Sequence, residues 1–371
     1  MRILEAFGEP IADGGQEAFV FGVLDRIDMN GLFIDCLTAY DCRSDYYREK
    51  VEMKGGKVFA LNLPFAPGRS REMIRAPFRA FLKVHFYDVV HIHSGSTSVL
   101  AIMAREAHRA GVKRVIVHSH VAGGRDSLKH VLLRWIASLS MKKNVDIYCA
   151  CSKEAAQWKF EPKYVKVTNI IKNGIDSNAF RYNPVKREEL RQRLGLEDAF
   201  VIGHVGRFMS QKNHEFLIEV FQEVLSRCDK ARLLLVGDGE NMQKIQRLVE
   251  ERRLRERVIF TGSVSNVSDY LQAMDVFVMP SKYEGLPIAA IEAQSTGLPA
   301  IVSDCVSHEI ELSPDVHFLD LDLGSGVWAD CIVKLIERSR KDNSDLIRAH
   351  GFDVSDTAKE VRKMYDPDGI G

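Results

Sequence analysis

The sequence predicts an α/β protein made of two Rossmann-like domains, each built on a parallel β-sheet. Short apolar runs alternate with helical segments along the whole chain, which is typical of parallel sheets with right-handed crossover connections. The chain has 371 residues, which is long for one hydrophobic core and sufficient for two. The polar segment 173–183 offers a linker, so we place the domains at residues 1–175 and 176–354.

The strands of both sheets are predicted from these apolar runs. They lie at residues 2–6, 33–38, 57–61, 89–93, 115–119 and 145–151 in the first half, and at 201–205, 232–236, 258–261, 276–279, 300–302 and 316–319 in the second. A last helix is expected from Ser355 to Met364. Ligands of open parallel sheets bind beyond the carboxyl ends of the strands, so two such sheets facing each other would form a cleft with a site on each wall.

Composition agrees with an ordinary soluble protein, since 46% of the residues are hydrophobic and 27% are charged. No apolar run approaches the roughly 20 residues needed to span a bilayer, and the first residues begin a strand instead of a signal peptide. Seven irregularly spaced cysteines argue against a disulfide framework and fit a reducing compartment. We therefore expect a cytoplasmic protein.

The segment from Glu284 to Glu292 is the most informative for function. It follows an apolar strand, and Gly285 and Leu286 lead to Pro287, which suits the first turn of a helix because the amide it lacks would be unpaired there. The free amides beside it form a seat for an anion. Carboxylates next to such a seat are suited to vicinal hydroxyls. The segment predicts a nucleotide-sugar site; the alternative, two solvated helix acids, is disfavoured because Glu292 lies among apolar residues.

Two cations follow another predicted strand, at residues 201–205. Arg207 can form a bidentate contact with phosphate oxygens, while Lys212, at the start of the next predicted helix, supplies a point charge. Together they would neutralise a diphosphate. Because surface Arg and Lys are common, these two cations alone are weak evidence for a diphosphate site. The acidic segment downstream strengthens that interpretation.

Motifs in a fixed order run through nearly the whole chain. They are Gly14-Gly15-Gln16-Glu17, Asn173-Gly174-Ile175-Asp176, Gly206-Arg207, Gln211-Lys212-Asn213, Leu235-Val236-Gly237-Asp238-Gly239, Phe260-Thr261-Gly262, the two glutamates described above and Gly297-Leu298-Pro299. This order closely resembles the retaining family 4 glycosyltransferases of the GT-B fold. Within that family the chain is most similar to the bacterial transferases of capsular and exopolysaccharide synthesis.

The resemblance implies roles for the residues of the second domain. Glu284 would contact hexose hydroxyls, Glu292 the ribose, and Arg207 with Lys212 the diphosphate of the donor, commonly a uridine nucleotide. Backbone from Gly262 to Val264 would frame the base. Asp-x-Asp pairs occur only near the C-terminus, at residues 320–322 and 366–368, so we expect no metal and no cofactor. A GxGxxG fingerprint is absent, which disfavours a nicotinamide dehydrogenase.

The first domain is expected to hold the acceptor. Gly14 and Gly15 would let the backbone approach the donor phosphates. His120, at the loop end of a strand, would lie near the reacting sugar, as a histidine or acid does in relatives; the alternative is a structural histidine. His91 and His93, on a neighbouring strand, favour a structural role. The resemblance also implies that the segment 355–371 packs against this domain.

Charge is divided unequally between the halves. Residues 1–180 carry 26 Lys and Arg against 19 Asp and Glu, a net charge of +7. Residues 181–371 carry the opposite net charge, so the whole chain is neutral. Basic residues interleaved with apolar ones run from Arg69 to Lys83 and from Arg125 to Lys143. Such segments suit an anionic membrane and an undecaprenyl-diphosphate-linked acceptor, the alternative being ordinary amphipathic helices. Nucleic acid is excluded as a partner by overall neutrality and the lack of a recognition motif.

The sequence thus favours a metal-independent retaining glycosyltransferase that moves a hexose or N-acetylhexosamine from a UDP-sugar to a saccharide acceptor, peripheral to the inner face of the cytoplasmic membrane. Two alternatives stay open. A non-hydrolysing nucleotide-sugar 2-epimerase shares the architecture but needs no acceptor. A non-catalytic partner subunit would bind the sugar nucleotide without turning it over.

Overall fold

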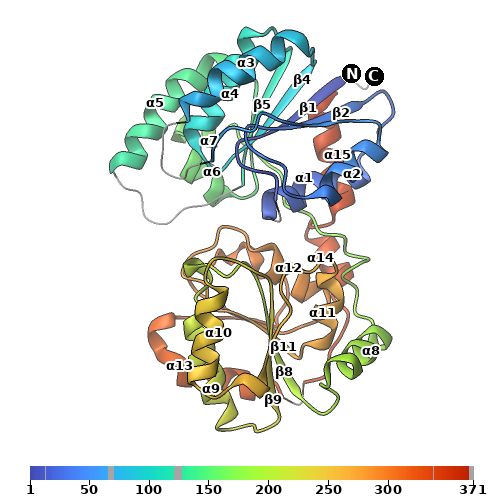
Figure 1. Cartoon of the computed structure of the whole chain (residues 1–371), viewed down its shortest axis with the longest axis vertical. Helices are drawn as coiled ribbons and strands as arrows, with labels where there is room; N and C mark the ends of the chain where they lie inside the picture. Colours follow the sequence, from blue (N-terminus) through green and yellow to red (C-terminus); the bar gives the residue numbers. More distant parts are fainter. Residues whose placement is uncertain (13, 66–70, 121–127, 337, 367–371) are drawn as a thin grey trace. The chain divides into compact units, whose positions relative to one another are not determined.

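The computed structural model describes residues 1–12, 14–65, 71–120, 128–336 and 338–366. The chain divides into two compact units, of which the first comprises residues 1–174 with 353–371 and the second residues 175–352. Our sequence analysis placed the boundary between residues 175 and 176. Each unit has its own parallel sheet (Figure 1). Each also has its own clusters of buried hydrophobic side chains.

The first unit contains a seven-stranded parallel sheet with the order β3-β2-β1-β4-β5-β6-β7. Its strands are β1 (Arg2–Phe7), β2 (Phe33–Thr38), β3 (Val58–Ala60), β4 (Val89–His93), β5 (Arg114–Ser119), β6 (Ile147–Ala150) and β7 (Asn169–Ile170). Its helices are α1 (Gly15–Arg26), α2 (Asp45–Met53), α3 (Arg75–Val84), α4 (Thr97–Arg109), α5 (Leu128–Asn144), α6 (Lys153–Lys159), α7 (Pro162–Val165) and α15 (Val354–Tyr365).

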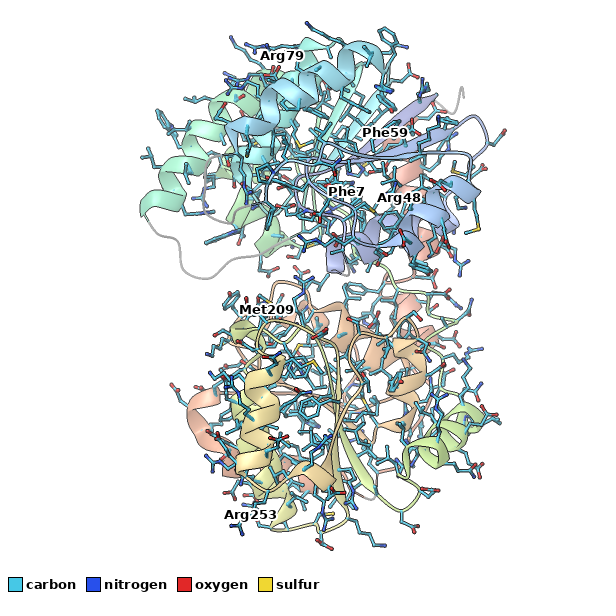
Figure 2. The ribbon with its side chains drawn as sticks, viewed as in Figure 1. Phe7, Arg48, Phe59, Arg79, Met209 and Arg253 are labelled. Atoms are coloured by element: carbon cyan, nitrogen blue, oxygen red, sulfur yellow. The ribbon has the colours of Figure 1, made fainter. Side chains whose placement is uncertain are left out.

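Helices cover both faces of this sheet. Residues of α1 and α15 pack on one face, where Phe7 of β1 stacks on Phe21, and residues of α3, α4, α5 and α6 pack on the other. Figure 2 labels Phe7 inside this unit. Every residue of β1 after Arg2 is buried, because a central parallel strand is covered on both sides. This is the physical reason that apolar runs predicted the strands.

The second unit contains a six-stranded parallel sheet with the order β10-β9-β8-β11-β12-β13. Its strands are β8 (Phe200–Val205), β9 (Ala231–Val236), β10 (Val258–Phe260), β11 (Val276–Met279), β12 (Ala300–Ser303) and β13 (Val316–Leu319). Its helices are α8 (Pro184–Leu194), α9 (His214–Leu225), α10 (Met242–Glu251), α11 (Val267–Ala273), α12 (Ile288–Ser295), α13 (Gly324–Val333) and α14 (Ser344–Ala349). Helices α9, α10 and α13 pack on one face, and α8, α11, α12 and α14 on the other.

The predicted α/β class with two parallel Rossmann-like sheets is confirmed. The predicted strands each overlap an observed one, whereas the two-residue strand β7 was not predicted. The last helix runs from Val354 to Tyr365, one residue longer at each end than expected, and packs against α1 of the first unit. Among the helices of the described ranges, none combines the length and the apolar character needed to cross a bilayer.

Candidate functional site

The carboxyl ends of β8 and β11 mark the candidate site of the second unit. In the order β10-β9-β8-β11-β12-β13 the chain runs outward from β8 in one direction and then resumes at β11 in the other. The carboxyl ends of two such neighbouring strands, where the strand order reverses, are where open parallel sheets bind ligands. The residues singled out in the sequence, Arg207, Lys212, Glu284 and the segment after it, occupy these two loops.

The loop after β8 holds both cations. The N–H of Gly206 donates to Val236 O over 3.0 Å, and the buried ring of Phe208 stacks on His214, so the loop is anchored on either side of the exposed Arg207. Lys212 does not begin the helix, as we had expected. It ends a 3₁₀ turn, Ser210–Lys212, and Asn213 with φ 57° separates it from α9. The left-handed residue breaks the helix before Lys212 can join it.

Lys212 and Glu284 are brought together. The Lys212 Nζ lies 2.6 Å from Glu284 Oε1, a close ion pair that lacks the alignment of a hydrogen bond, and the side chains are 15% and 11% exposed. Two bonds of 2.8 Å fasten the loops, one from Lys282 N to Gln211 O and one from Gln211 Nε2 to Tyr283 O. Loops from two different strands thus hold a cation and a carboxylate side by side.

The amino end of α12 faces this loop without a cap. Pro287 stands just before the first helical residue instead of inside the first turn, which corrects our expectation. No side chain of the described residues caps the helix. Ala290 N donates to Pro287 O, whereas the amides of Ile288 and Ala289 precede the first residue that has an intrahelical acceptor. Gly285 and Leu286 link Glu284 to this helix end. The arrangement is suited to an anion.

Glu292 lies on α12, four residues after its start. Its carboxyl group is partly exposed, and within the described ranges it forms neither a hydrogen bond nor an ion pair. Burial among apolar neighbours raises the pKa of Glu292 from 4.5 to about 7. A half-buried carboxylate without a partner is costly to keep, which favours a role in binding over a structural one.

Glycines bring the ends of β8, β9 and β10 into contact. Gly237 has φ 132°, and a Cβ there would come within 2.2 Å of Gly206 O. Its N–H donates to Gly262 O over 3.0 Å, and Gly262 itself has φ 70° with open space beside it. Val264 is partly buried and packs against the core of the second unit. Only glycine permits this close approach at residue 237.

In the first unit, Gly14 is the N-cap of α1 and Gly15 its first residue, where an added Cβ would meet no atom within 4 Å. His120 follows β5 and is partly exposed, and His93 Nδ1 lies 2.8 Å from His120 Nε2. His91 and His93 are buried and hydrogen-bonded. Sequence reasoning missed Glu5, which bonds to His93; a charged residue inside a predicted buried strand was the available signal.

The first acidic pair near the C-terminus, Asp320 and Asp322, belongs to a turn and does not join a group of metal-ligating side chains among the described residues. Asp320 Oδ1 accepts the N–H of Asp322 over 2.8 Å, so it caps the 3₁₀ turn Leu321–Leu323. The second pair extends beyond the described residues. Metal independence stays a prediction.

The basic segments of the first unit differ from each other. Arg79 of α3 (labelled in Figure 2) pairs with the buried Glu106 over 2.6 Å, so α3 uses its charge structurally. Helix α5 instead exposes an apolar surface, each side chain between 39% and 55% exposed: Val131, Leu132, Leu133, Trp135, Ile136 and Leu139. Arg69, Arg125 and the side chain of Lys129 lie outside the described part of the chain.

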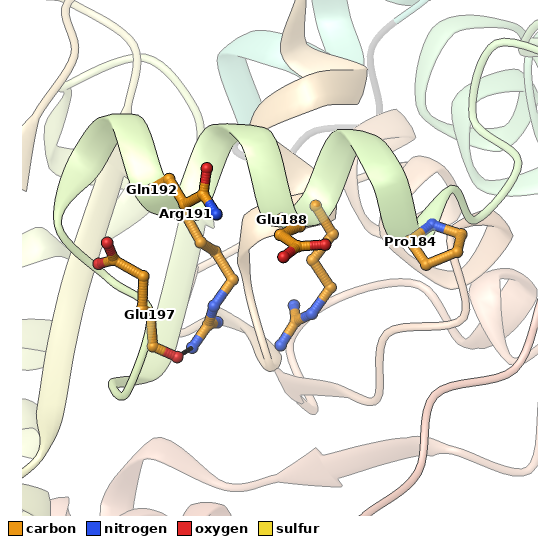
Figure 3. A pocket seen from close by; sticks show the side chains of 6 residues that line it. Pro184, Glu188, Arg191, Gln192 and Glu197 are labelled. Atoms are coloured by element: carbon orange, nitrogen blue, oxygen red, sulfur yellow. Dashed lines mark hydrogen bonds between the residues drawn. The ribbon is translucent and has the colours of Figure 1, made fainter.

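A hollow of about 360 Å³ lies along α8, lined by Pro184, Arg187, Glu188, Arg191, Gln192 and Glu197 (Figure 3). Arg187 and Arg191 bond to Asp275 and to backbone carbonyls of Met274 and Ala273. Asp275 directly precedes β11, so this hollow lies at the amino end of the sheet, opposite the loops described above. Its arginines serve the fold.

Two family models match the chain, one within each unit. Residues 14–168 match a glycosyl transferase 4-like domain, and residues 186–313 match glycosyl transferases group 1. Together they span most of the sequence. The chain therefore belongs to the glycosyltransferases with these two domains.

Particular relatives agree with this family. The chain is 28% identical to the putative glycosyltransferase EpsF of Bacillus subtilis (strain 168), with 95% of this chain and 93% of the relative covered. It is 33% identical to the UDP-Gal:alpha-D-GlcNAc-diphosphoundecaprenol alpha-1,3-galactosyltransferase of Escherichia coli, over 60% of this chain and 59% of that protein. The crystal structure of Anabaena Alr3699/HepE in complex with UDP superposes with a TM-score of 0.76 at 19% identity, covering 99% of this chain and all of that one. This likeness shows the GT-B fold.

Proposed function

We propose that the protein transfers a hexose or N-acetylhexosamine, with retention of anomeric configuration, from a UDP-sugar to a lipid-linked saccharide during surface polysaccharide synthesis. The observation that carries the donor part is the Lys212–Glu284 pair, 2.6 Å apart, beside the uncapped start of α12. A cation and a helix amino end suit the charged diphosphate of a nucleotide sugar, and a carboxylate beside them suits the sugar hydroxyls.

The chemistry follows from these groups. As the anomeric bond breaks, negative charge grows on the departing diphosphate, and Lys212, Arg207 and the α12 amides would stabilise it. Glu284 would accept hydrogen bonds from hexose hydroxyls. Glu292, which has no partner among the described residues, would accept hydrogen bonds from the two ribose hydroxyls. Two cations and a helix end supply the charge that a divalent ion supplies in other transferases. We therefore expect activity without added metal.

The choice of uridine is supported by similar proteins. The Escherichia coli relative is named for UDP-Gal, and Anabaena Alr3699/HepE has been crystallised with UDP and with UDP-glucose. Backbone from Gly262 to Val264, held at the end of β10, would frame the base. The role in surface polysaccharide synthesis rests on the names of relatives, among them a capsular polysaccharide biosynthesis glycosyltransferase of Staphylococcus aureus.

A lipid-linked acceptor is supported by two independent observations. The Escherichia coli relative is named for a diphosphoundecaprenol acceptor. Helix α5 exposes six apolar side chains between Val131 and Leu139, and Lys142 and Lys143 lie in its last turn. An apolar surface with adjacent lysines suits the interface of an anionic bilayer. We propose that α5 rests on the membrane where such an acceptor resides.

Calorimetric titration with UDP and a panel of UDP-hexoses in the presence of EDTA tests the donor site. One UDP-sugar should bind selectively, and Lys212→Ala should weaken its binding by at least about tenfold, or 1.4 kcal/mol. Lys244→Ala is the matched control, because Lys244 is an exposed lysine of the same unit paired with Glu215 over 2.6 Å. Equal loss in both variants, or binding that requires a metal, would contradict the proposal. Conversion of the donor to its 2-epimer without an acceptor would favour the epimerase.

A further inference from the structure

A chain of buried polar side chains crosses the first unit between its sheet and the helices α1 and α15. Its members are Glu5 of β1, His91 and His93 of β4, His118 of β5, His120 just beyond β5, and Tyr365 of α15. All except His120 are at most 5% exposed. So many polar groups in an apolar core require an explanation, because each unpaired one is costly.

The strand register places these residues on one face. Glu5 lies beside His91 on the neighbouring strand, and His93 lies beside His118. Residues two apart on a strand point to the same side, so His91 and His93 share that face, as do His118 and His120. The rings of His118 and His120 stack with centroids 4.2 Å apart. Helix α15 then adds Tyr365 from the far end of the sequence.

One branch of hydrogen bonds leads from Glu5 to His120. Glu5 Oε2 lies 2.7 Å from His93 Nε2, and His93 Nδ1 lies 2.8 Å from His120 Nε2. An ionised carboxylate can only accept, so His93 carries its proton on Nε2 and accepts at Nδ1. His120 must then carry its proton on Nε2, which leaves a lone pair on its Nδ1.

The second branch of hydrogen bonds leads from the other carboxylate oxygen of Glu5, Oε1, to His118. The hydroxyl of Tyr365 donates to Glu5 Oε1 and accepts from His91 Nδ1 over 2.9 Å. His91 Nε2 then accepts from His118 Nδ1 over 3.2 Å. Among the described residues, the two end atoms, His118 Nε2 and His120 Nδ1, have no hydrogen-bond partner. The direction of every link is thus set by the single charge of Glu5.

The electrostatics agree with this assignment. Burial lowers the pKa of His93 to about 4 and also lowers the pKa of His118 and His120, so these rings are neutral at pH 7. Burial alone would raise the pKa of Glu5, but the attraction and hydrogen bonds of His91 and His93 outweigh it and hold that pKa below its usual value. A charged Glu5 with neutral His93, His118 and His120 fits the hydrogen-bond directions given above.

We infer that Glu5 and His93 are positioning residues that lock His120 in its Nε2–H tautomer, so that its Nδ1 serves as the hydrogen-bond acceptor for a saccharide hydroxyl. The saccharide part rests on the proposed function; the tautomer does not. Of the four rings only that of His120 is partly exposed, but its Nδ1 is itself buried and has no partner among the described residues, so a hydroxyl that bonds to it would satisfy this acceptor. Tyr365 assists by occupying the second oxygen of Glu5, which gives the last helix a part in shaping the site.

A metal is the competing interpretation of the cluster. Ligand atoms of His91, His93 and His118 lie within 4.8 Å of one another. However, His91 and His93 already use both ring nitrogens in the branches, as His118 uses Nδ1. To bind these nitrogens, a metal would have to displace the ring protons that form the hydrogen bonds. Glu5 and Tyr365 would then lose hydrogen-bond partners.

Nitrogen-15 spectroscopy of histidine-labelled wild-type protein tests the tautomers directly. His93 and His120 should show the proton on Nε2, and His91 and His118 should show it on Nδ1, with each signal assigned by a single histidine substitution. A proton on His120 Nδ1, or a doubly protonated ring at pH 7, would overturn the inference. Stoichiometric uptake of Zn²⁺ that shifts all four signals would overturn it too.

Kinetics test whether the hydrogen bonds of Glu5 and His93 affect catalysis through His120. His93→Leu breaks the branch, whereas His93→Gln retains a donor for Glu5 and an acceptor for His120. For release of UDP from the UDP-sugar that binds in calorimetry, His93→Leu should lower kcat by about tenfold with little change in KM, and His93→Gln should recover most of it. In a His120→Ala background His93→Leu should have no further effect. Additive losses, or equal losses in both His93 variants, would refute positioning. If no donor binds, the proposed function fails, yet the spectroscopic result still decides the tautomer.

Discussion

Replacing Glu292 by Gln should stabilise the second unit above pH 7 and at the same time weaken donor binding. In the folded protein burial raises the pKa of Glu292 to about 7, against 4.5 for an ordinary glutamate. Between these two values the unfolded chain has lost the proton that the folded chain retains. Folding stability of the wild type therefore falls as the pH rises from about 4.5 to 7. A neutral Gln of nearly the same shape does not carry this penalty.

The magnitude follows from the pKa difference. Each pKa unit is equivalent to about 1.4 kcal/mol, so the full effect is about 3 kcal/mol at pH 8 and close to zero at pH 4.5. Gln cannot offer a charged acceptor to the ribose hydroxyls, and loss of such bonds costs about 1.5–3 kcal/mol, or roughly ten- to a hundredfold in UDP affinity. A gain in stability with a loss of affinity is the signature of a carboxylate kept for binding.

Urea unfolding of both proteins at pH 5, 6, 7 and 8, with UDP titration at pH 8, measures these effects. The two units can unfold in separate transitions, so the free energy is taken from the unfolding transition whose midpoint changes with the substitution. The stability difference between variant and wild type should grow with pH and level off above pH 7. If the variant has the same free energy of unfolding as the wild type at every pH, or binds UDP as tightly as the wild type, the assigned environment of Glu292 is refuted.

Other substitutions test further parts of the structure. Gly237→Ala should destabilise the second unit by about 2 kcal/mol or more, since its Cβ would approach Gly206 O within 2.2 Å at a φ of 132°. Thermal unfolding measures this loss of stability. Gly55→Ala is the control and should cost less, because Gly55 has a positive φ but open space around it. Trp135→Ser combined with Ile136→Ser should reduce sedimentation with phosphatidylglycerol vesicles severalfold because apolar contact is lost. The same change at Phe86, which is 75% exposed outside α5, should not. Equal effects at both places, or unchanged binding, would argue against α5 as the membrane surface.

Much of the fold was predictable because central parallel strands are buried on both faces and therefore form continuous apolar runs. Strand β7 escaped prediction because two residues, Asn169 and Ile170, carry no such run. Lys212 was assigned to a helix because the apolar periodicity of α9 begins near it, whereas the left-handed backbone of Asn213 depends on the local turn. Short-range conformations of this kind compete with periodicity and are decided by the folded environment.

The candidate site was partly visible for a similar reason. Motif spacing pointed to the loops after β8 and β11, but their fastening through Gln211 and the 2.6 Å approach of Lys212 to Glu284 depend on strand order. The histidine branches were less accessible still. Tyr365 donates to Glu5 across 360 positions of sequence, a pairing that no local pattern encodes.

The central claim is sugar transfer at the site formed by Lys212 and Glu284. It is tested most directly by incubating the protein, with EDTA, with radiolabelled UDP-sugars and a lipid extract, and comparing wild type with Glu284→Ala. Label should enter the lipid fraction from one UDP-sugar with the wild type, and should be lost with the variant while the variant still unfolds in a cooperative thermal transition. Transfer that survives in the folded Glu284→Ala variant would contradict the assignment.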